Sequence, residues 1–204
     1  MKSERFQKTL ENKFENLDKD RDKHIREKVA RLVFGASIVR VFKPGMKEKL
    51  IPKLAKIKIE DLKKRKQERI FKKWFQKESR KIAKIIKGDK KKRINVYAHA
   101  PKILALYCRA LFNENCKALS KQEYKRIEKL LFVPIDSYVI RALRNLEGYG
   151  KIKGLKNIKS MADFKRGTFM NIQEILKGAS QKTRIPRIVF DYVWGEEIKQ
   201  VQTK

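Results

Sequence analysis

Apolar residues recur at intervals of three and four along most of the chain, which is the spacing of one buried helix face. The first run has its apolar positions at Ile25, Val29, Leu32, Val33, Ala36 and Val39. After the break at Pro44-Gly45, similar patterns predict helices at about 50–57, 59–86, 98–115, 120–131, 136–146, 161–180 and 187–199. The alternating pattern of a strand is weak and confined to residues 94–97. The sequence therefore predicts an all-α protein.

The predicted helix over 59–86 combines an apolar seam with a basic outer face. Its seam consists of Leu62, Ile70, Trp74, Ile82 and Ile85. Its outward-facing basic residues are Lys63, Lys64, Arg65, Lys66, Lys72 and Lys73. Phe71, Trp74 and Phe75 recur at helical spacing, which favours positions in the core over exposed platforms for stacked bases.

The charge of the chain is extreme and unevenly distributed. The 204 residues include 54 Lys and Arg against 23 Asp and Glu, a net charge of +31. Residues 43–93 alone hold 22 basic and 6 acidic side chains, a net of +16. Such a field attracts polyanions, and nucleic acid is the commonest polyanion inside a cell. The alternative is a lysine-rich surface that only keeps the protein in solution.

The charge distribution divides the chain into a strongly basic N-terminal half, residues 1–93, and a second half, residues 94–204, that carries the candidate chemistry. We expect the two halves to form one compact unit. The residues expected to contact the backbone of nucleic acid are Lys63, Lys64, Arg65, Lys66, Lys90, Lys91, Lys92, Arg93 and Arg141.

Several other classes of protein do not fit the sequence. No apolar run approaches the roughly 20 residues that a membrane span needs, and the first residues lack the apolar stretch of a secretory signal. Cys108 and Cys116 form neither a CxxC pair nor a cluster with histidine, so we expect reduced thiols, one of them on a core face, and no metal site. We expect an intracellular, cytoplasmic protein associated with the nucleoid, without a cofactor and monomeric.

Two charged residues carry the candidate chemistry. Pro101-Lys102 is expected to open an apolar helix, where the positive end of the helix dipole lowers the pKa of an amine and favours its use as a nucleophile. Asp136 follows Val133-Pro134-Ile135 and is expected to open the next amphipathic helix. Each has a simpler interpretation, since Lys102 suits a solvent-facing helix end and Asp136 suits an N-cap.

Three segments together resemble the helix-hairpin-helix DNA glycosylases, and within them the archaeal 8-oxoguanine DNA glycosylase branch. Residues 133–143, Val-Pro-Ile-Asp-Ser-Tyr-Val-Ile-Arg-Ala-Leu, are similar to the Val-Asp-x-x-Val-x-Arg helix start of the superfamily. Residues 102–111 are similar to the helix opened by the nucleophilic lysine of that branch, with the aspartate some thirty residues on. Residues 184–195 are similar to its C-terminal Ile-Pro-x-x-x-x-Asp-x-x-x-Trp pattern.

The resemblance implies a helical domain with a cleft between two helical halves and a bifunctional glycosylase/lyase acting on an oxidised purine of damaged duplex DNA. Lys102 would form the Schiff base and Asp136 would activate it. Asp191 and Trp194 would lie in the wall of the base pocket, where an indole can stack on a flipped base. The alternative for this pair is a buried last helix with Asp191 as its cap. His99 is a candidate proton relay, or else a capping or phosphate-facing residue.

The chain also departs from the family pattern. The glycine-rich hairpin that usually precedes the nucleophile is replaced by residues 95–101, Pro101 stands in place of a glutamine, and the interval from Asp191 to Trp194 is one residue shorter. The net charge of +31 and the missing hairpin glycines suit a second hypothesis, a non-catalytic, basic protein on the same scaffold that binds DNA or RNA. Trapping of a Schiff base with borohydride distinguishes the two hypotheses.

Overall fold

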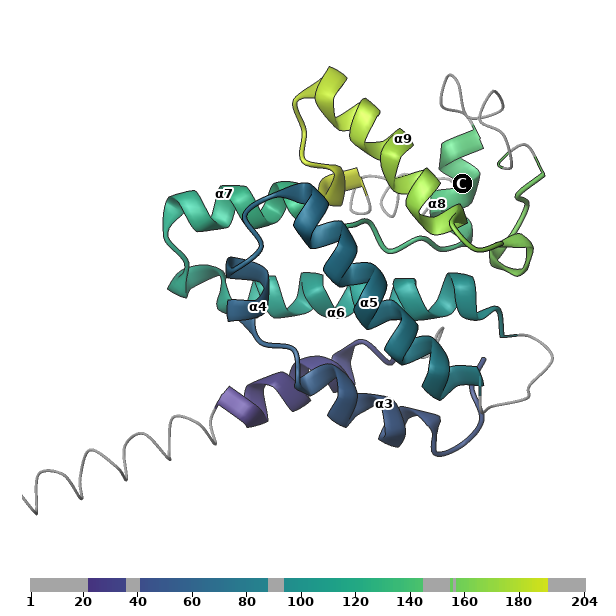
Figure 1. Cartoon of the computed structure of the whole chain (residues 1–204), viewed down its shortest axis with the longest axis horizontal. Helices are drawn as coiled ribbons and strands as arrows, with labels where there is room; N and C mark the ends of the chain where they lie inside the picture. The colour runs from purple at the N-terminus through teal and green to yellow at the C-terminus, as the bar shows by residue number, and fades with distance from the viewer. Residues whose placement is uncertain (1–21, 36–40, 88–93, 145–154, 156, 191–204) are drawn as a thin grey trace, which may run out of the picture.

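The computed structural model describes residues 22–35, 41–87, 94–144, 155 and 157–190, and every regular element within them is helical (Figure 1). A helix covers residues 22–32. The helices that follow are α3 (Met46–Ala55), α4 (Ile59–Lys63), α5 (Glu68–Lys87), α6 (Val96–Asn115), α7 (Lys121–Leu130), α8 (Ser137–Arg144) and α9 (Thr168–Thr183). Short 3-10 turns lie at η1 (Cys116–Ala118), η3 (Met161–Asp163) and η4 (Arg187–Val189). The prediction of an all-α protein is confirmed for this part of the chain.

The two long helices α5 and α6 cross in the middle of the molecule (Figure 1). α3 packs against α5, while α4 and α9 pack against α6. The buried apolar side chains form one continuous cluster, which extends from Val29 in the first helix to Ile188 in η4. The helices therefore share a single hydrophobic core, and burial of its large side chains contributes about 1.5–3 kcal/mol for each of them.

Phenylalanine rings form the centre of this core. Phe75 of α5 contacts Phe132 and Phe169, with ring centroids 4.8 and 5.7 Å away, and Phe71 contacts Phe132 at 5.2 Å. Phe71, Phe75 and their neighbour Trp74 are all buried. The prediction that these aromatic residues of the basic segment belong to the core is confirmed.

The predicted single helix over 59–86 is wrong, because the chain turns between α4 and α5. The backbone N–H of Arg65 donates to the carbonyl of Leu62, a 3-10 contact that ends α4. The Arg65 guanidinium folds back to hydrogen-bond Asp61 and lies 4.5 Å from the centre of the Trp74 ring. The basic run therefore occupies a turn rather than the outer face of a straight helix.

Two apolar positions that were assigned to buried faces are exposed. Ile70 is 47% exposed and Leu32 is 65% exposed. The buried face of α5 is centred on Phe71, Phe75 and Ile82, and Ile70 lies about 100° around the helix from Phe71, toward solvent. Large aromatic side chains therefore decide which face of α5 turns inward.

Three predicted boundaries also differ from the structure. The weak strand candidate at 94–97 is wrong because α6 begins at Val96. The helix predicted over 161–180 begins only at Thr168, after Gly167, whose φ of 94° is readily adopted by glycine. The helix predicted over 187–199 begins with the 3-10 turn η4, Phe190 after it is α-helical, and the continuation from residue 191 lies outside the described residues.

The segment between α7 and α8, residues 131–136, is irregular in backbone yet lies in the core. Leu131 to Ile135 are all buried, so the polar groups of their backbone need partners inside the protein. Gln173 of α9 supplies two of these partners through its side-chain amide. Its Oε1 accepts from the Val133 N–H at 3.1 Å and its Nε2 donates to the Val133 carbonyl at 2.8 Å.

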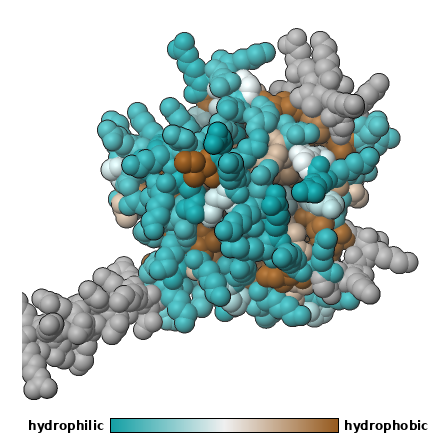
Figure 2. Space-filling view, viewed as in Figure 1, coloured by the Kyte–Doolittle hydropathy of each residue, from teal (hydrophilic) through white to brown (hydrophobic). Residues whose placement is uncertain are grey.

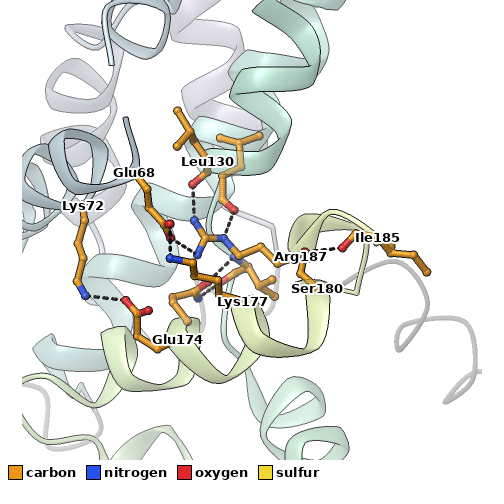
Figure 3. Close-up of polar contacts among 11 residues, drawn as sticks. Glu68, Lys72, Leu130, Glu174, Lys177, Ser180, Ile185 and Arg187 are labelled. Atoms are coloured by element: carbon orange, nitrogen blue, oxygen red, sulfur yellow. Dashed lines mark hydrogen bonds and ion pairs between the residues drawn. The ribbon is translucent and has the colours of Figure 1, made fainter. Parts of the chain in front are cut away.

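Arg187 secures the start of the same segment (Figure 3). Its guanidinium, almost fully buried, donates to the carbonyls of Leu131 and Leu130 at 3.0 and 2.8 Å and to Glu68 at 3.1 Å. These two carbonyls end α7 and have no partner within that helix. Glu68 also binds Lys177 at 2.6 Å. Burial opposes the ionisation of Glu68, but its hydrogen bond to Lys177 and the charge of Arg187 hold the pKa of this carboxyl below its ordinary value.

We expect replacement of Gln173 by alanine to lower the free energy of unfolding by about 2–4 kcal/mol, because both Val133 backbone groups would be left buried without a partner. The measurement is urea denaturation followed by circular dichroism. The matched control is Gln181→Ala on the exposed side of α9, which should change the value by less than about 0.5 kcal/mol. Equal effects of the two substitutions would contradict the role assigned to the Gln173 amide.

Candidate active site

Asp136 begins α8, as the sequence predicts. Its Oδ1 accepts hydrogen bonds from the backbone N–H groups of Tyr138 and Val139, both at 3.0 Å, and α8 starts at Ser137. This is the geometry of an N-cap, in which a side-chain oxygen satisfies N–H groups that have no partner in the first turn. Capping fixes the orientation of the carboxylate and leaves Oδ2 outside these bonds.

The prediction that Pro101-Lys102 opens a helix is wrong. α6 begins at Val96, and Asn95 is its N-cap, with its side-chain oxygen accepting from the Tyr97 N–H at 2.9 Å. Pro101 lies inside α6, and Lys102 is about two turns from its start. The dipole of a helix terminus acts mainly within the first turn, so it does not account for the electrostatics of Lys102.

Lys102 and Asp136 nevertheless lie side by side. The Lys102 Nζ is 3.9 Å from Asp136 Oδ2, the oxygen that the cap leaves outside its two hydrogen bonds. The Lys102 side chain is 14% exposed and that of Asp136 is 29% exposed. Burial lowers the pKa of Lys102 below that of a free lysine, and the negative charge of Asp136 only partly opposes this shift. The cause of the lowered pKa is thus desolvation rather than the helix dipole.

His99 lies one turn before Lys102 on α6. Its Nδ1 is 2.8 Å from the Asn95 carbonyl, and since a carbonyl only accepts, Nδ1 carries the proton and Nε2 remains an acceptor. Burial lowers the pKa of His99; the Asn95 carbonyl opposes that shift and the charge of Lys102 adds to it. The ring packs edge-on against Phe42, with centroids 6.0 Å apart. Burial and the charge of Lys102 therefore favour the neutral imidazole.

A cavity of about 780 Å³ opens beside this pair, between the starts of α6 and α8 and the turn η3. We name it the His99 cavity, because His99 lines it whereas Lys102 and Asp136 do not. His99 and Ser137 line it, and they are close neighbours of Lys102 and Asp136 in their helices. Asn95, which also lines it, donates through Nδ2 to the carbonyls of Ala162 and Phe164, at 2.9 and 2.8 Å. Asn95 thereby fixes η3 against the first turn of α6.

Asn95 and Gln173 were not among the residues that the sequence singled out. For Asn95 a signal exists, because an asparagine immediately before an apolar helical run is a typical N-cap. Recognising it would have placed the start of α6 correctly. Gln173 offers no comparable signal, since its partner Val133 is 40 residues away.

The residues expected to contact the nucleic-acid backbone fall into three groups. Lys64, Lys66 and Arg141 are exposed, on the turn after α4 and on α8. Lys63 instead pairs with Glu123 at 3.2 Å, and Arg65 is held by Asp61 and Trp74, so the structure corrects the expectation that all four residues of the run 63–66 face outward. Lys90, Lys91, Lys92 and Arg93, with the pocket candidates Asp191 and Trp194, lie outside the described residues.

The surface agrees with the charge of the chain. Figure 2 shows a face covered largely by hydrophilic side chains, with apolar ones scattered between them. Among the described residues no helix is long and apolar enough to span a membrane, and no three His, Cys, Asp or Glu side chains cluster to hold a metal ion. Cys108 is buried in the core and Cys116 is half-buried, both as free thiols. The prediction that one cysteine lies on a core face is confirmed.

Comparison of the chain with protein-family models, curated proteins and solved structures finds no match.

The cap and the candidate chemistry of Asp136 can be separated by substitution. Asparagine is nearly as good an N-cap as aspartate, so Asp136→Asn should leave the free energy of unfolding within about 0.5 kcal/mol, whereas Asp136→Ala should lower it by about 0.5–2 kcal/mol. The measurement is urea denaturation of both variants. The matched control is Ser120→Ala, which removes the N-cap of α7 away from Lys102. Equal losses for Asn and Ala at position 136 would contradict the capping role.

Proposed function

We propose that the protein removes a damaged base from DNA and then cleaves the strand, with Lys102 as the nucleophile and Asp136 as its activating carboxylate. The observation that carries the proposal is the 3.9 Å approach of a largely buried amine, its pKa lowered by desolvation, to the carboxylate oxygen that the α8 cap leaves outside its hydrogen bonds. The three-part resemblance to helix-hairpin-helix DNA glycosylases supports the same assignment, with an oxidised purine such as 8-oxoguanine as the substrate.

The chemistry follows from these two groups. The lone pair of the Lys102 amine attacks C1′ of the flipped nucleotide, and the base leaves with the electrons of its bond to the sugar and takes up a proton. Asp136, as a carboxylate, stabilises the positive charge that develops on the sugar. Opening of the sugar ring converts the adduct into a Schiff base. Loss of a C2′ proton from the Schiff base then expels the 3′ phosphate by β-elimination. The neutral His99 is a suitable acceptor for a proton in these steps.

The second candidate function is binding to nucleic acid without catalysis. It is favoured by the exposed Lys64, Lys66 and Arg141 on a chain of net charge +31. It is also compatible with the geometry of Asp136, because an aspartate that caps a helix near a lysine can have a purely structural role.

Lys102→Gln should remove borohydride trapping of duplex DNA containing 8-oxoguanine and lower the single-turnover excision rate by at least about 10³-fold. It should leave duplex affinity within a few-fold, because one buried lysine adds little to the charge of the surface. The control is Lys121→Gln, which removes an exposed lysine of α7 and should trap like the unmodified protein. Trapping that persists in Lys102→Gln would assign the nucleophile to another lysine, and no trapping by the unmodified protein would favour the binding function.

The pH dependence tests the coupling between Lys102 and Asp136. Only the neutral amine attacks, so the excision rate should rise as pH passes through the pKa of Lys102. The negative charge of Asp136 raises that pKa. Asp136→Asn should therefore lose most of the rate and shift the remaining rise to lower pH, measured by single-turnover excision from about pH 6 to 10. A shift to higher pH would contradict the electrostatic coupling.

A further inference from the structure

A second cavity lies between α5, the first turns of α6 and the start of α9, with a volume of about 350 Å³. We name it the Arg166 pocket. Tyr97 and Pro101 of α6 line it, whereas Lys102 does not. At about 100° per residue, Tyr97 points roughly 140° away from Lys102 around the helix axis. The pocket is therefore separate from the amine and the carboxylate of the candidate active site.

The charge of the Arg166 pocket is entirely positive. Arg80 and Arg166 line it, and no aspartate or glutamate does. The start of α9, at Gly167, adds the positive end of a 16-residue helix that has neither a side-chain cap nor an acidic residue in its first turn. The buried hydroxyl of Ser79, which has no hydrogen-bond partner among the described residues, belongs to the same lining. These groups suit a phosphate.

Apart from Gln76, the other walls of the pocket are mainly apolar. They are formed by Pro101, Phe169, Met170 and the ring of Tyr97, which is 46% exposed although tyrosine is large and partly apolar. Proteins that bind single strands combine a basic groove with aromatic rings on which the bases stack. The volume lies near the lower end of the range of about 300–1,000 Å³ for small-ligand pockets, which suits one nucleotide.

We infer that the Arg166 pocket binds one nucleotide of a single-stranded stretch of nucleic acid. Its phosphate lies between Arg80, Arg166 and the start of α9, and its base lies against Tyr97. A strand is the favoured source because Tyr97 lines both this pocket and the His99 cavity, so a strand that crosses that cavity passes the pocket as well. The inference rests on the nucleic-acid partner in the proposed function, but not on the chemistry of Lys102.

The test is photocrosslinking of a single strand of about ten nucleotides that carries 5-iododeoxyuridine, with the modified tyrosines identified by mass spectrometry. Two variants probe the pocket. Arg80→Gln combined with Arg166→Gln removes its charge, and Ala83→Leu fills part of it with a residue that is favourable in helices. Lys121→Gln combined with Lys125→Gln is the charge-matched control, on the exposed side of α7, which packs against α4 and η4.

The unmodified protein and the control should crosslink at Tyr97 in preference to Tyr138, which has a similar exposed fraction but does not line the pocket. Both pocket variants should lose the Tyr97 crosslink by about tenfold. Lys102→Gln should retain it, so failure of the proposed chemistry and failure of this inference give different results. Thymidine monophosphate should compete for the crosslink at lower concentration than inorganic phosphate does.

Three results would overturn the inference. The first is equal crosslinking of Tyr97 and Tyr138, and the second is a Tyr97 crosslink that neither pocket variant reduces. The third is equal competition by inorganic phosphate and thymidine monophosphate, which would reduce the pocket to a site for any anion.

Discussion

The pair of hydrogen bonds between the Gln173 side chain and the Val133 backbone is the constraint on which the candidate site depends. Residues 132–135 lie in neither a helix nor a sheet that could satisfy their backbone, yet they are buried. Gln173 closes a two-bond pair with Val133, and Arg187 binds the carbonyls of Leu130 and Leu131. Asp136 directly follows this segment, so α9 and η4 decide where the carboxylate meets Lys102 on α6.

Local patterns in the sequence predicted much of this fold, while contacts between distant residues account for what they missed. Helical periodicity located most helices, and the short-range capping preference of aspartate located the start of α8. The turn after α4 is accompanied by the stacking of the Arg65 guanidinium on the Trp74 ring. The buried face of α5 depends on aromatic rings that contact Phe132 and Phe169. Such partners are unknown until the chain is folded, which is why a straight helix with Ile70 inside was predicted.

In the candidate site, too, local patterns predicted some features, while others depend on contacts between distant residues. The two residues that the sequence selected, Lys102 and Asp136, lie 3.9 Å apart, but the reason given for the special state of Lys102 was wrong. The sequence pattern predicts a helix start at Pro101, although Asn95 provides the cap six residues earlier. The pKa of Lys102 is lowered by burial, which depends on the packing of the whole core around α6. Desolvation cannot be predicted from the spacing of residues along one helix.

The carboxylate of Asp136 has two roles, so the stability of α8 and the chemistry proposed for Lys102 depend on the same group. Oδ1 caps α8 and Oδ2 faces the Lys102 amine, so a change that rotates the carboxylate affects the helix and the amine together. Tyr97, about 140° around α6 from Lys102, borders both cavities. If a strand does bind along this surface, the same helix would separate the group that reacts with a sugar from the group that holds the neighbouring nucleotide. In that arrangement the pocket arginines would bind the phosphates of the nucleic acid at a distance from Lys102. Their positive charge would then not lie beside an amine that must lose its proton.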